Sequence, residues 1–426
     1  MSQPFTVDGA PDPGRESAPL VVRTVRVEDP GALLALLPDD DAITAWVRRG
    51  EGVVGWGAAA VCRTSGRDRF AEASRWWAEH YRTAVVRDAV SEPGSGLVCF
   101  GSFAFGDDPG ESVLVVPRVV VGRRGATTWV TTTGVGAIST PPRVAVAADP
   151  VAPSGVTFAD GALSGAEWET VVAEAVRRIN DGALEKVVLA RDLLATAADD
   201  VDVRWPLRRL AASYPMCWTF HVDGLFGATP EMLVRRERGL VTSRVLAGTI
   251  RRTGDDARDL ALAATLARSS KDLEEHEYAV RSVADALAPY CSSMNVPEAP
   301  FVLHLPNVMH LATDVAGVIP DQGPVTSLDL AAALHPSAAV GGTPSESATR
   351  LIDEIEGMRR GRYAGPVGWM DASGDGEWGL ALRSGELDGA VVRLFAGCGI
   401  VADSDPGAEL AEAQAKFVPV RDALGE

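Results

Sequence analysis

The feature that most constrains the fold is a series of Val- and aromatic-rich segments separated by turns and not by helices. Residues 365–400 contain about three such segments, with the turn sequences Ser-Gly-Asp-Gly at 373–376 and Leu-Asp-Gly at 387–389. Residues 217–236 and 239–250 likewise predict antiparallel strands. Strands joined by such short turns pair antiparallel, which does not fit strict βαβ alternation. The sequence therefore predicts an α+β protein with largely antiparallel sheets.

Helices and further strands are expected beside these hairpins. The additional strands have the same Val-rich composition and are expected at 21–27, 96–105, 112–121 and 185–197. The helices are expected at 68–86, from a capping box at Ser164–Glu167 to Gly182, in the region before Cys217, at 255–290, after a capping box at Thr343–Glu346 with Pro344 at the first helical position, and from Asp405-Pro406 to about Leu424.

A proline-bearing stretch at residues 141–155, PPRVAVAADPVAPSG, predicts a linker between two parts of the chain. We expect a flexible N-terminus at 1–18, an N-terminal part of the fold at 19–158 and a C-terminal region at 159–426. The chain has 426 residues, of which 46% are hydrophobic, and this is enough to bury a large core.

The charge and the termini indicate a class of protein. The formal net charge is −18, whereas a general nucleic-acid-binding protein carries a basic face. The N-terminal stretch lacks the basic and apolar regions of a signal peptide, and no run of about 18 apolar residues predicts a membrane span. The five cysteines form no Cys-x-x-Cys pair. We therefore expect a reduced, cytoplasmic protein that binds neither nucleic acid nor membrane.

Arginine carries nearly all of the positive charge, and the only lysines are Lys186, Lys271 and Lys416. Genomic base composition explains the rarity of lysine but not these positions. Lys186 begins the apolar segment Lys-Val-Val-Leu-Ala, where partial burial of a lysine would disfavour its charged form and favour a general base near neutral pH. The alternative is a strand-end lysine whose ammonium group extends to solvent.

Glu231 follows a turn in the segment Phe-Gly-Ala-Thr-Pro-Glu. Pro230 makes the entry to this position rigid, and Gly227 allows a ligand to approach the backbone. The segment therefore indicates a positioned carboxylic acid. An exposed glutamate at the start of a strand is the alternative.

Two helices carry acidic residues on one face. Asp272 and Glu275 are spaced i, i+3 in the first helix, and Glu409, Glu412 and Lys416 are spaced i, i+3 and i+7 in the last. Carboxylate oxygens of this kind suit Mg²⁺, which uses few protein ligands and keeps waters for itself and an anionic ligand. The alternative for each face is a solvated surface, on which Glu412 and Lys416 form an ordinary i,i+4 pair.

Several residues could bind carboxylates. Arg383 lies in an expected strand, where its fork of donors suits a carboxylate, although a cross-strand charge pair is the alternative. Gly397 and Gly399 flank Cys398, and their backbone N–H groups could hold a carboxylate, with a β-bulge as the alternative. His310 could donate a hydrogen bond in a site or be satisfied in the core. The sequence contains no H-E-x-x-H, P-loop or G-x-S-x-G motif.

The ordered combination of motifs is more informative than any one of them. In order, the chain carries Lys186-Val-Val-Leu-Ala-Arg191, Phe226-Gly-Ala-Thr-Pro-Glu231, Leu246-Ala-Gly-Thr-Ile-Arg251, Lys271-Asp-Leu-Glu-Glu-His276, His310-Leu-Ala-Thr313, Leu334–Pro344, Gly361-Arg-Tyr-Ala-Gly-Pro-Val-Gly-Trp369, and Ala396-Gly-Cys-Gly-Ile400 with Glu409-x-x-Glu412-x-x-x-Lys416. This series resembles the chorismate-utilising enzyme family and, within it, the isochorismate synthases. The resemblance is strong over residues 160–426 and weaker over 20–150.

The resemblance implies a large sandwich of two facing, mainly antiparallel β-sheets with helices packed outside, in which residues 159–426 form the chorismate-binding catalytic region. It also implies a Mg²⁺-dependent isochorismate synthase, an isomerase of the hydroxymutase type. Lys186 matches the family's general base, which activates a water to attack ring carbon 2 of chorismate. Glu231 matches the general acid, which protonates the hydroxyl that leaves ring carbon 4.

The same resemblance assigns the remaining site residues. Glu275 and Glu412 match the Mg²⁺ carboxylates, and Asp272 and Glu409 are their neighbours, acting through metal-bound water or hydrogen bonds. The residues expected to contact the substrate are Gly248, His310, Tyr363, Arg383, Gly397, Gly399 and Lys416.

Two positions separate the branches of this family. Members that install an amine at ring carbon 4 through a covalent lysine carry Pro-Ile-Lys-Gly-Thr, whereas this chain has Val-Leu-Ala-Gly-Thr with Ala247. Ammonia-using anthranilate synthases generally lack a lysine at the position of Lys186 and need a glutaminase, so we expect water as the nucleophile and no glutaminase subunit. The expected product would feed menaquinone or siderophore biosynthesis. A salicylate synthase, which makes the same intermediate and then eliminates pyruvate, is the nearest alternative, and a non-catalytic chorismate-binding subunit is a further one.

Overall fold

The computed structural model describes residues 18–40, 42–107, 110–137, 144–304, 308–320 and 325–425. Within these ranges, the side chains of four residues are not described, namely Thr249, Lys271, Glu275 and Val308. The N-terminal segment predicted to be flexible thus lies outside the described residues, apart from Ala18.

The strands form two arms that meet at one strand, β6 (Ser112–Arg124). The first, here called the β3 arm, consists in spatial order of β3 (Glu51–Thr64), β2 (Thr44–Arg48), β10 (Trp218–Val222), β11 (Leu225–Thr229), β20 (Ser384–Asp388), β21 (Val391–Ile400) and β9 (Lys186–Thr196), with β8 (Thr157–Asp160) and β17 (Gly342–Thr343) on the outer edge of β9. The second, here called the β5 arm, consists of β5 (Val98–Ser102), β18 (Pro366–Asp371), β19 (Gly376–Leu380), β12 (Met232–Glu237), β13 (Leu240–Arg251) and β16 (Val308–Val318), with β14 (Ser293–Asn295) and β15 (Phe301–His304) on the outer edge of β16. A short extension from β6 consists of β7 (Thr127–Val135), β1 (Leu20–Val27) and β4 (Val85–Asp88).

The pairing register of β6 explains why the sheet divides. Residues 113–115 of β6 pair with β5, residues 119–124 pair with β7, and the opposite edge of β6 pairs with β3. Among the described residues, every strand pairing is antiparallel except that of β1 with β4. The mainly antiparallel α+β fold that the turn pattern predicts is therefore confirmed.

The two arms face each other across an apolar core. Trp46 of β2 and Phe220 of β10 belong to the same buried cluster as Phe100 of β5 and Trp369 of β18. The indole Nε1 of Trp46 also donates to the Glu377 carboxylate of β19 at 2.7 Å, which joins the two arms directly. The arms are thus the two layers of the predicted sandwich, and burial of large aromatic side chains between them drives their association.

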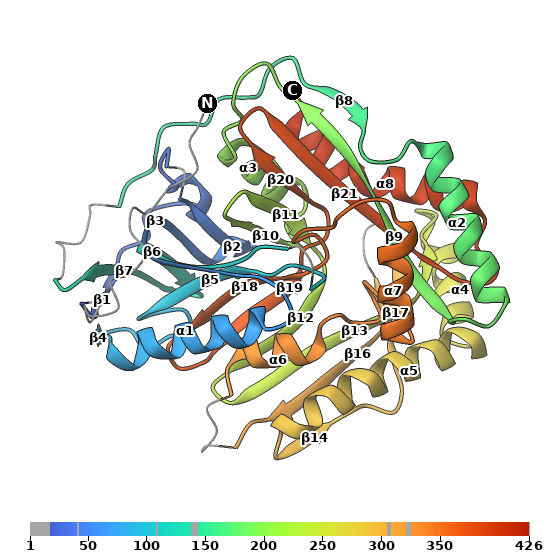
Figure 1. Cartoon of the computed structure of the whole chain (residues 1–426). Coiled ribbons are helices and arrows are strands. Elements are labelled where there is room, and N and C mark those ends of the chain that lie inside the picture. Colours follow the sequence, from blue (N-terminus) through green and yellow to red (C-terminus); the bar gives the residue numbers. More distant parts are fainter. Residues whose placement is uncertain are drawn as a thin grey trace.

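The helices pack on the outer faces of this sandwich (Figure 1). The β3 arm is covered by α2 (Gly165–Asn180), α3 (Arg204–Ser213), α7 (Ser345–Ile355) and α8 (Pro406–Leu424). The β5 arm is covered by α4 (Asp256–Leu266), α5 (Ser270–Leu287) and α6 (Ser327–Leu334), and α1 (Arg69–Thr83) packs against α6 and β3. Short 3₁₀ turns occur at Leu33–Ala35 and Ala288–Tyr290. No helix within the described ranges is long and apolar enough to cross a membrane.

The helix start signals were right in some places and wrong in others. The capping box at Ser164 and Glu167 is formed at the start of α2, and Asp405 caps α8, as the sequence predicts. The region 255–290 is not continuous, because the Ser269 side chain accepts from the Asp272 N–H and caps a second helix, α5.

The second predicted capping box, at Thr343–Glu346, is absent. Helix α7 begins after Pro344, and no side chain caps it. Thr343 lies instead in β17, where its carbonyl accepts from the Glu185 N–H at 2.8 Å. Residues 365–400 form four strands, β18 to β21, and not about three.

Candidate active site

The candidate site lies where element ends from both arms converge. Lys186 begins β9, Glu231 lies in the turn between β11 and β12, Arg383 precedes β20, and Lys416 lies on α8. The positive charges of Lys186, Arg383 and Lys416 each act to lower the pKa of the Glu231 carboxyl group. The structure therefore brings together four residues that are distant in the sequence.

Glu231 is a half-buried acid held by the backbone on both sides. Its N–H donates to Thr229 Oγ1 at 3.2 Å, and its carbonyl accepts from the Leu380 N–H at 3.1 Å. Burial raises the pKa of its carboxyl group above the ordinary value, although the three cations act in the opposite direction. A carboxyl group that holds its proton closer to neutral pH is suited to act as a general acid.

Lys186 is the first residue of a strand that is paired on both edges. Thr343 of β17 lies opposite Lys186, and Ile400 of β21 lies opposite Val187. A Cβ atom added at Gly399 would lie 3.0 Å from the Lys186 Cε. Glycine at position 399 therefore leaves room for the lysine side chain.

The backbone groups of Gly397 and Gly399 point away from β9. Their partners in register, Ala190 and Val188, direct their own N–H groups away from β21, to the Glu356 carboxylate and to the Gly341 carbonyl, both at 2.8 Å. In an antiparallel pair, two residues that lie opposite each other either both bond across the pair or both point their N–H and C=O groups away from it. Gly397 and Gly399 therefore point these groups away from β9. On that outer edge β20 pairs no further than Phe395. The Gly397 and Gly399 N–H groups thus lie on an edge of β21 that, among the described residues, has no strand partner.

Lys416 and two carboxylates project from the first turns of α8. The Lys416 ammonium group donates to the Gly397 carbonyl at 2.8 Å and pairs with Glu412 Oε1 at 2.7 Å. Burial acts to raise the pKa of Glu412, but Lys416 outweighs it, with Arg251 and Arg383 in support, and the pKa is lowered. Glu412 therefore stays a carboxylate near neutral pH.

Glu409 and Glu412 form a group of metal-ligand type with Cys398. One ligand atom from each of the three residues lies within 4.8 Å of the others. Burial raises the pKa of Glu409, while a hydrogen bond from Ser404 at 2.8 Å opposes this. Burial also raises the pKa of the Cys398 thiol to about 12, so the sulfur stays protonated. The two hard carboxylates fit Mg²⁺, and the thiol does not compete for it.

Arg383 and His310 bring further polar groups to the site. The sequence predicts that Arg383 lies in a strand, and this is wrong. Arg383 lies in the loop before β20, where its φ is +50°. Within the described residues its guanidinium makes no hydrogen bond or ion pair, so its fork of donors can bind an anion. Burial lowers the pKa of His310, and the charges of Arg383 and Lys416 lower it further. This half-buried ring is therefore neutral near neutral pH.

Tyr363 is buried beside Gly397. Its ring stacks on Phe395 with the centroids 5.0 Å apart, and its hydroxyl oxygen lies 3.1 Å from where a Cβ at position 397 would be. Burial raises the pKa of the Tyr363 phenol, which therefore remains a hydrogen-bond donor.

Gly248 and the start of α5 close the site on the side of the β5 arm. Gly248 forms a bulge in β13 with φ +74°, and a Cβ there would lie 3.2 Å from the Asp272 Cβ. Glu275 lies on the same helix as Asp272, but its side chain lies outside the described residues. The structure thus places Asp272 beside Gly248 and leaves the predicted ligand role of Glu275 as a prediction.

Sequence reasoning missed three contributors to the site. Arg251 ends the motif Leu246–Arg251, and its charge lowers the pKa of Glu412. Ser404, in the loop before α8, binds Glu409. Cys398 is buried, and its sulfur lies among the acidic groups. Only tertiary packing reveals these neighbours.

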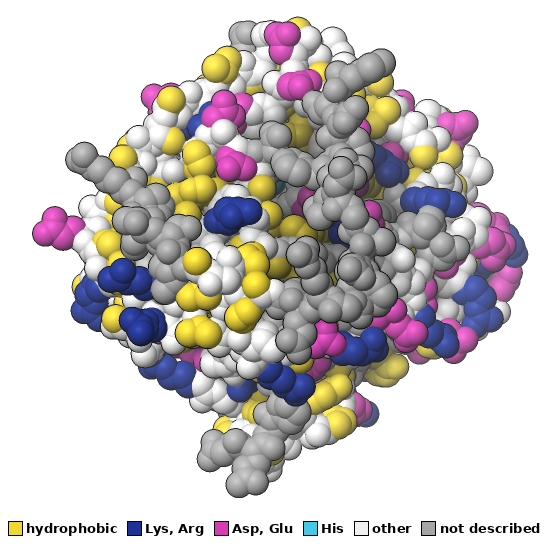
Figure 2. Space-filling view, turned by 60° about the vertical axis from the view of Figure 1, so that its left-hand side comes forward, with side chains coloured by type: hydrophobic (Ala, Val, Ile, Leu, Met, Phe, Trp, Pro, Cys, Tyr) yellow, Lys and Arg dark blue, Asp and Glu magenta, His cyan; other side chains and the backbone are white. Residues whose placement is uncertain are grey.

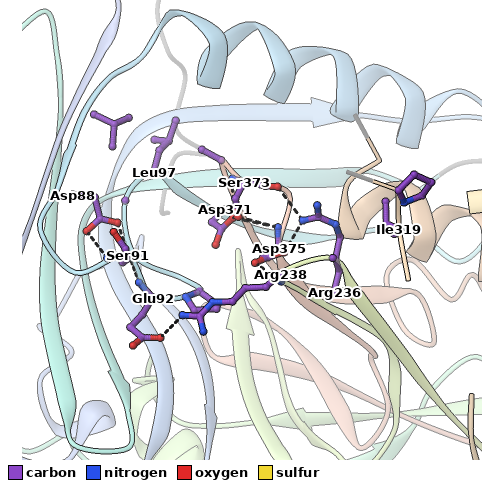
Figure 3. A pocket seen from close by; sticks show the side chains of 17 residues that line it. Asp88, Ser91, Glu92, Leu97, Arg236, Arg238, Ile319, Asp371, Ser373 and Asp375 are labelled. Atoms are coloured by element: carbon purple, nitrogen blue, oxygen red, sulfur yellow. Dashed lines mark hydrogen bonds and ion pairs between the residues drawn. The ribbon is translucent and has the colours of Figure 1, made fainter. Parts of the chain in front are cut away.

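A cavity of about 500 Å³ lies elsewhere, between the residues before β5, the β12–β13 turn and the β18–β19 hairpin (Figure 3). Its two arginines pair with carboxylates of the same cavity: Arg236 pairs with Asp375 at 2.6 Å, and Arg238 pairs with Glu92 at 3.2 Å. Asp371 accepts from the Gly94 N–H at 3.0 Å and so ties the hairpin to the residues before β5. None of the predicted site residues lines this cavity.

The charges on the surface are mixed. Among the described residues on the face seen in Figure 2, Lys and Arg side chains alternate with Asp and Glu toward the right, and several Lys and Arg side chains gather at the lower left.

The fold and the site together define a class of protein. The family model described as chorismate binding enzyme matches residues 20–425, and the chain belongs to this family.

Relatives and solved structures narrow the comparison. The isochorismate synthase MenF of Bacillus subtilis (strain 168) is 32% identical over 403 residues, which cover 88% of this chain and 85% of that protein. The isochorismate synthase DhbC of the same organism is 40% identical over 270 residues, which cover 61% of this chain and 68% of that protein. The solved structure of MenF, the menaquinone-specific isochorismate synthase from Escherichia coli, is similar with a TM-score of 0.78 and 26% identity, covering 96% of each chain.

Proposed function

We propose that this protein is a Mg²⁺-dependent isochorismate synthase that converts chorismate to isochorismate. The observation that carries the proposal is the convergence of Lys186, Arg383 and Lys416 on the Glu231 carboxyl group. Similarity to isochorismate synthases over most of the chain supports the same activity. The product would supply menaquinone or siderophore biosynthesis, and the similar MenF of Escherichia coli is described as menaquinone-specific.

The charge distribution fits a dianionic substrate. A chain with a net charge of −18 repels such a molecule at long range, so local cations must offset this repulsion. Arg383 and Lys416 provide them beside the reacting groups. We assign Arg383, Lys416, Tyr363 and the N–H groups of Gly397 and Gly399 to the substrate carboxylates, and His310 and Gly248 to the ring.

The metal would be held by carboxylates from two helices. Glu412 and Glu275 would bind it directly, and Glu409 and Asp272 would act through water or hydrogen bonds. Bound there, Mg²⁺ would neutralise the ring carboxylate of the substrate and fix its orientation.

The reaction then needs one proton acceptor and one proton donor. The Lys186 side chain takes a proton from the water whose oxygen bonds to ring carbon 2. Glu231, as the neutral acid, gives a proton to the hydroxyl that leaves ring carbon 4 as water. One water is consumed and one is released, so the reaction is an isomerisation. The base cannot be an arginine, because arginine does not lose its proton in proteins.

Product analysis tests this proposal. The purified protein is incubated with chorismate and Mg²⁺, and the products are separated by chromatography. Isochorismate without pyruvate is the expected result. Salicylate with pyruvate would identify a salicylate synthase, and binding of chorismate without turnover under any divalent metal would identify a non-catalytic chorismate-binding subunit.

A further inference from the structure

The outer edge of β9 has a gap directly behind Lys186. Strand β17 pairs with residues 186–187 and β8 pairs with residues 193–196, so no strand of the described part of the chain covers the backbone of residues 188–192 on that edge. An uncovered stretch of buried backbone needs other hydrogen-bond partners. The first partner is the Trp168 indole, which donates to the Ala190 carbonyl at 3.1 Å.

Two further partners come from one buried ion pair, Glu356 with Arg360. Their side chains are 0% and 3% exposed, and the Arg360 guanidinium binds both carboxylate oxygens at 2.8 and 2.5 Å. The same guanidinium donates to the Val188 carbonyl at 2.6 Å, and the Glu356 carboxylate accepts from the Ala190 N–H at 2.8 Å. The pair thus takes the place of a missing strand on the edge of β9.

Arg360 also fixes the loop that leads to β17. It donates to the Val340 carbonyl at 2.8 Å, and the next residue, Gly341, accepts from the Val188 N–H at 2.8 Å. Two residues further on, Thr343 lies opposite Lys186. One guanidinium therefore holds both the strand that begins with Lys186 and the only segment, among the described residues, that pairs with Lys186 on this edge.

The chemistry of the pair suits a rigid link. Burial acts to lower the pKa of Arg360, but the Glu356 charge outweighs this and the pKa is raised, so the fork of donors stays intact. The Arg360 guanidinium also lies over the Phe105 ring, 4.3 Å from its centroid. A buried ion pair is rarely the most stable choice for a core, and in some proteins such pairs are retained for conformational specificity.

We propose that Glu356 and Arg360 are positioning residues that hold Lys186 where its amine can take the proton from the attacking water. The inference rests on the proposed function, because it concerns the base of that reaction. Neither residue contacts the substrate in this account. Their effect should therefore appear in the chemical step and not in the binding of substrate.

The variants Arg360→Lys and Glu356→Gln test the proposal. Arg360→Lys keeps the charge but loses the fork, and Glu356→Gln keeps the shape but loses the charge. The kcat should fall by about 10- to 100-fold, because small displacements of a catalytic group cost this much. The KM, and the Kd of a non-reacting chorismate analogue, should change by no more than about twofold, because only the chemical step is affected. Circular dichroism checks that each variant is folded.

A matched control and a second readout complete the experiment. Arg236→Lys alters another largely buried ion pair, remote from the site, and should leave kcat and KM unchanged. Protein labelled at the lysine side chains contains only three lysines, and in Glu356→Gln the signal of Lys186 should move more than those of Lys271 and Lys416. An unchanged kcat in both variants, a parallel change of KM and kcat, or an unmoved Lys186 signal would overturn the inference. Absence of isochorismate with the wild-type protein would instead overturn the proposed function, and the lysine signals would still test the positioning.

Discussion

Replacing Glu231 with glutamine removes the proposed proton donor with little change of shape. Removal of a general acid typically costs about 10²- to 10⁴-fold in rate. At 1.36 kcal/mol for each factor of ten, this is about 3–5 kcal/mol of lost transition-state stabilisation. Arg383 and Lys416, which are assigned to the substrate, remain in place beside residue 231. The loss should therefore appear in kcat, whereas KM should change little.

The pH dependence gives this prediction a sign. Wild-type turnover needs the protonated acid, so it should fall as the pH rises through the raised pKa of Glu231. That alkaline loss should be absent from the residual activity of Glu231→Gln. The assay is isochorismate formation over a range of pH, with Glu237→Gln, at the far end of strand β12, as the control that retains activity. Retention of wild-type kcat by Glu231→Gln would refute the assignment.

The same substitution should affect stability. A raised folded-state pKa means that the wild-type protein loses stability as the pH rises from the unfolded-state pKa of glutamate, about 4.3, through the folded-state value. Glu231→Gln avoids this loss. Urea unfolding should therefore show no difference between the two proteins at acid pH and a more stable variant near neutral pH. A variant that is equally or less stable at neutral pH would contradict the burial argument.

Three further predictions concern the metal, the base and a helix cap. Glu412→Gln should weaken Mg²⁺ binding, measured by calorimetry, by about 100-fold or more, because loss of even a residue that only hydrogen-bonds to a metal ligand costs about 10- to 100-fold. The control variant Glu274→Gln, at an exposed position, should bind Mg²⁺ as the wild-type protein does. Equal Mg²⁺ affinities of Glu412→Gln and the wild-type protein would show that Glu412 is not a metal ligand. Lys186→Arg keeps the charge and should lose turnover by about 10²- to 10⁴-fold, whereas Lys271→Arg should be tolerated; an active Lys186→Arg enzyme would rule out the base assignment. Ser164→Ala breaks the capping box of α2 and should lower the free energy of unfolding by about 1 kcal/mol, and an unchanged urea midpoint would show that the cap contributes nothing.

The antiparallel fold could be predicted because its signals are local. The turn sequence at 373–376 joins β18 to β19, and the one at 387–389 joins β20 to β21, and each of these two pairs of strands is antiparallel. The division of the sheet at β6 could not be predicted, because it depends on β5 and β7 sharing one edge of a single strand. The failed capping box at Thr343 has a similar cause, since β17 pairs with β9, more than 150 residues earlier.

The candidate site shows the same limit. The separate acidic faces and the ordered motifs predict which residues carry the chemistry, and the structure brings most of these residues to one place. The role of the Glu356–Arg360 pair could not be predicted from the sequence, because the backbone groups that it binds lie about 170 residues earlier, on β9. The apolar segment Leu-Ala-Leu-Arg-Ser predicts a strand at Arg383, whereas the Arg383 backbone adopts φ +50°. Local composition does not specify such a turn.

The central claim is that Lys186 activates a water which becomes the new hydroxyl of the product. The most direct test is turnover of chorismate in water enriched in oxygen-18, followed by mass spectrometry of the isochorismate formed. The account predicts one labelled oxygen in the product, at ring carbon 2, with the wild-type protein and no labelled product with Lys186→Ala. Isochorismate without the label would mean that the hydroxyl migrates within the molecule, and it would contradict the account.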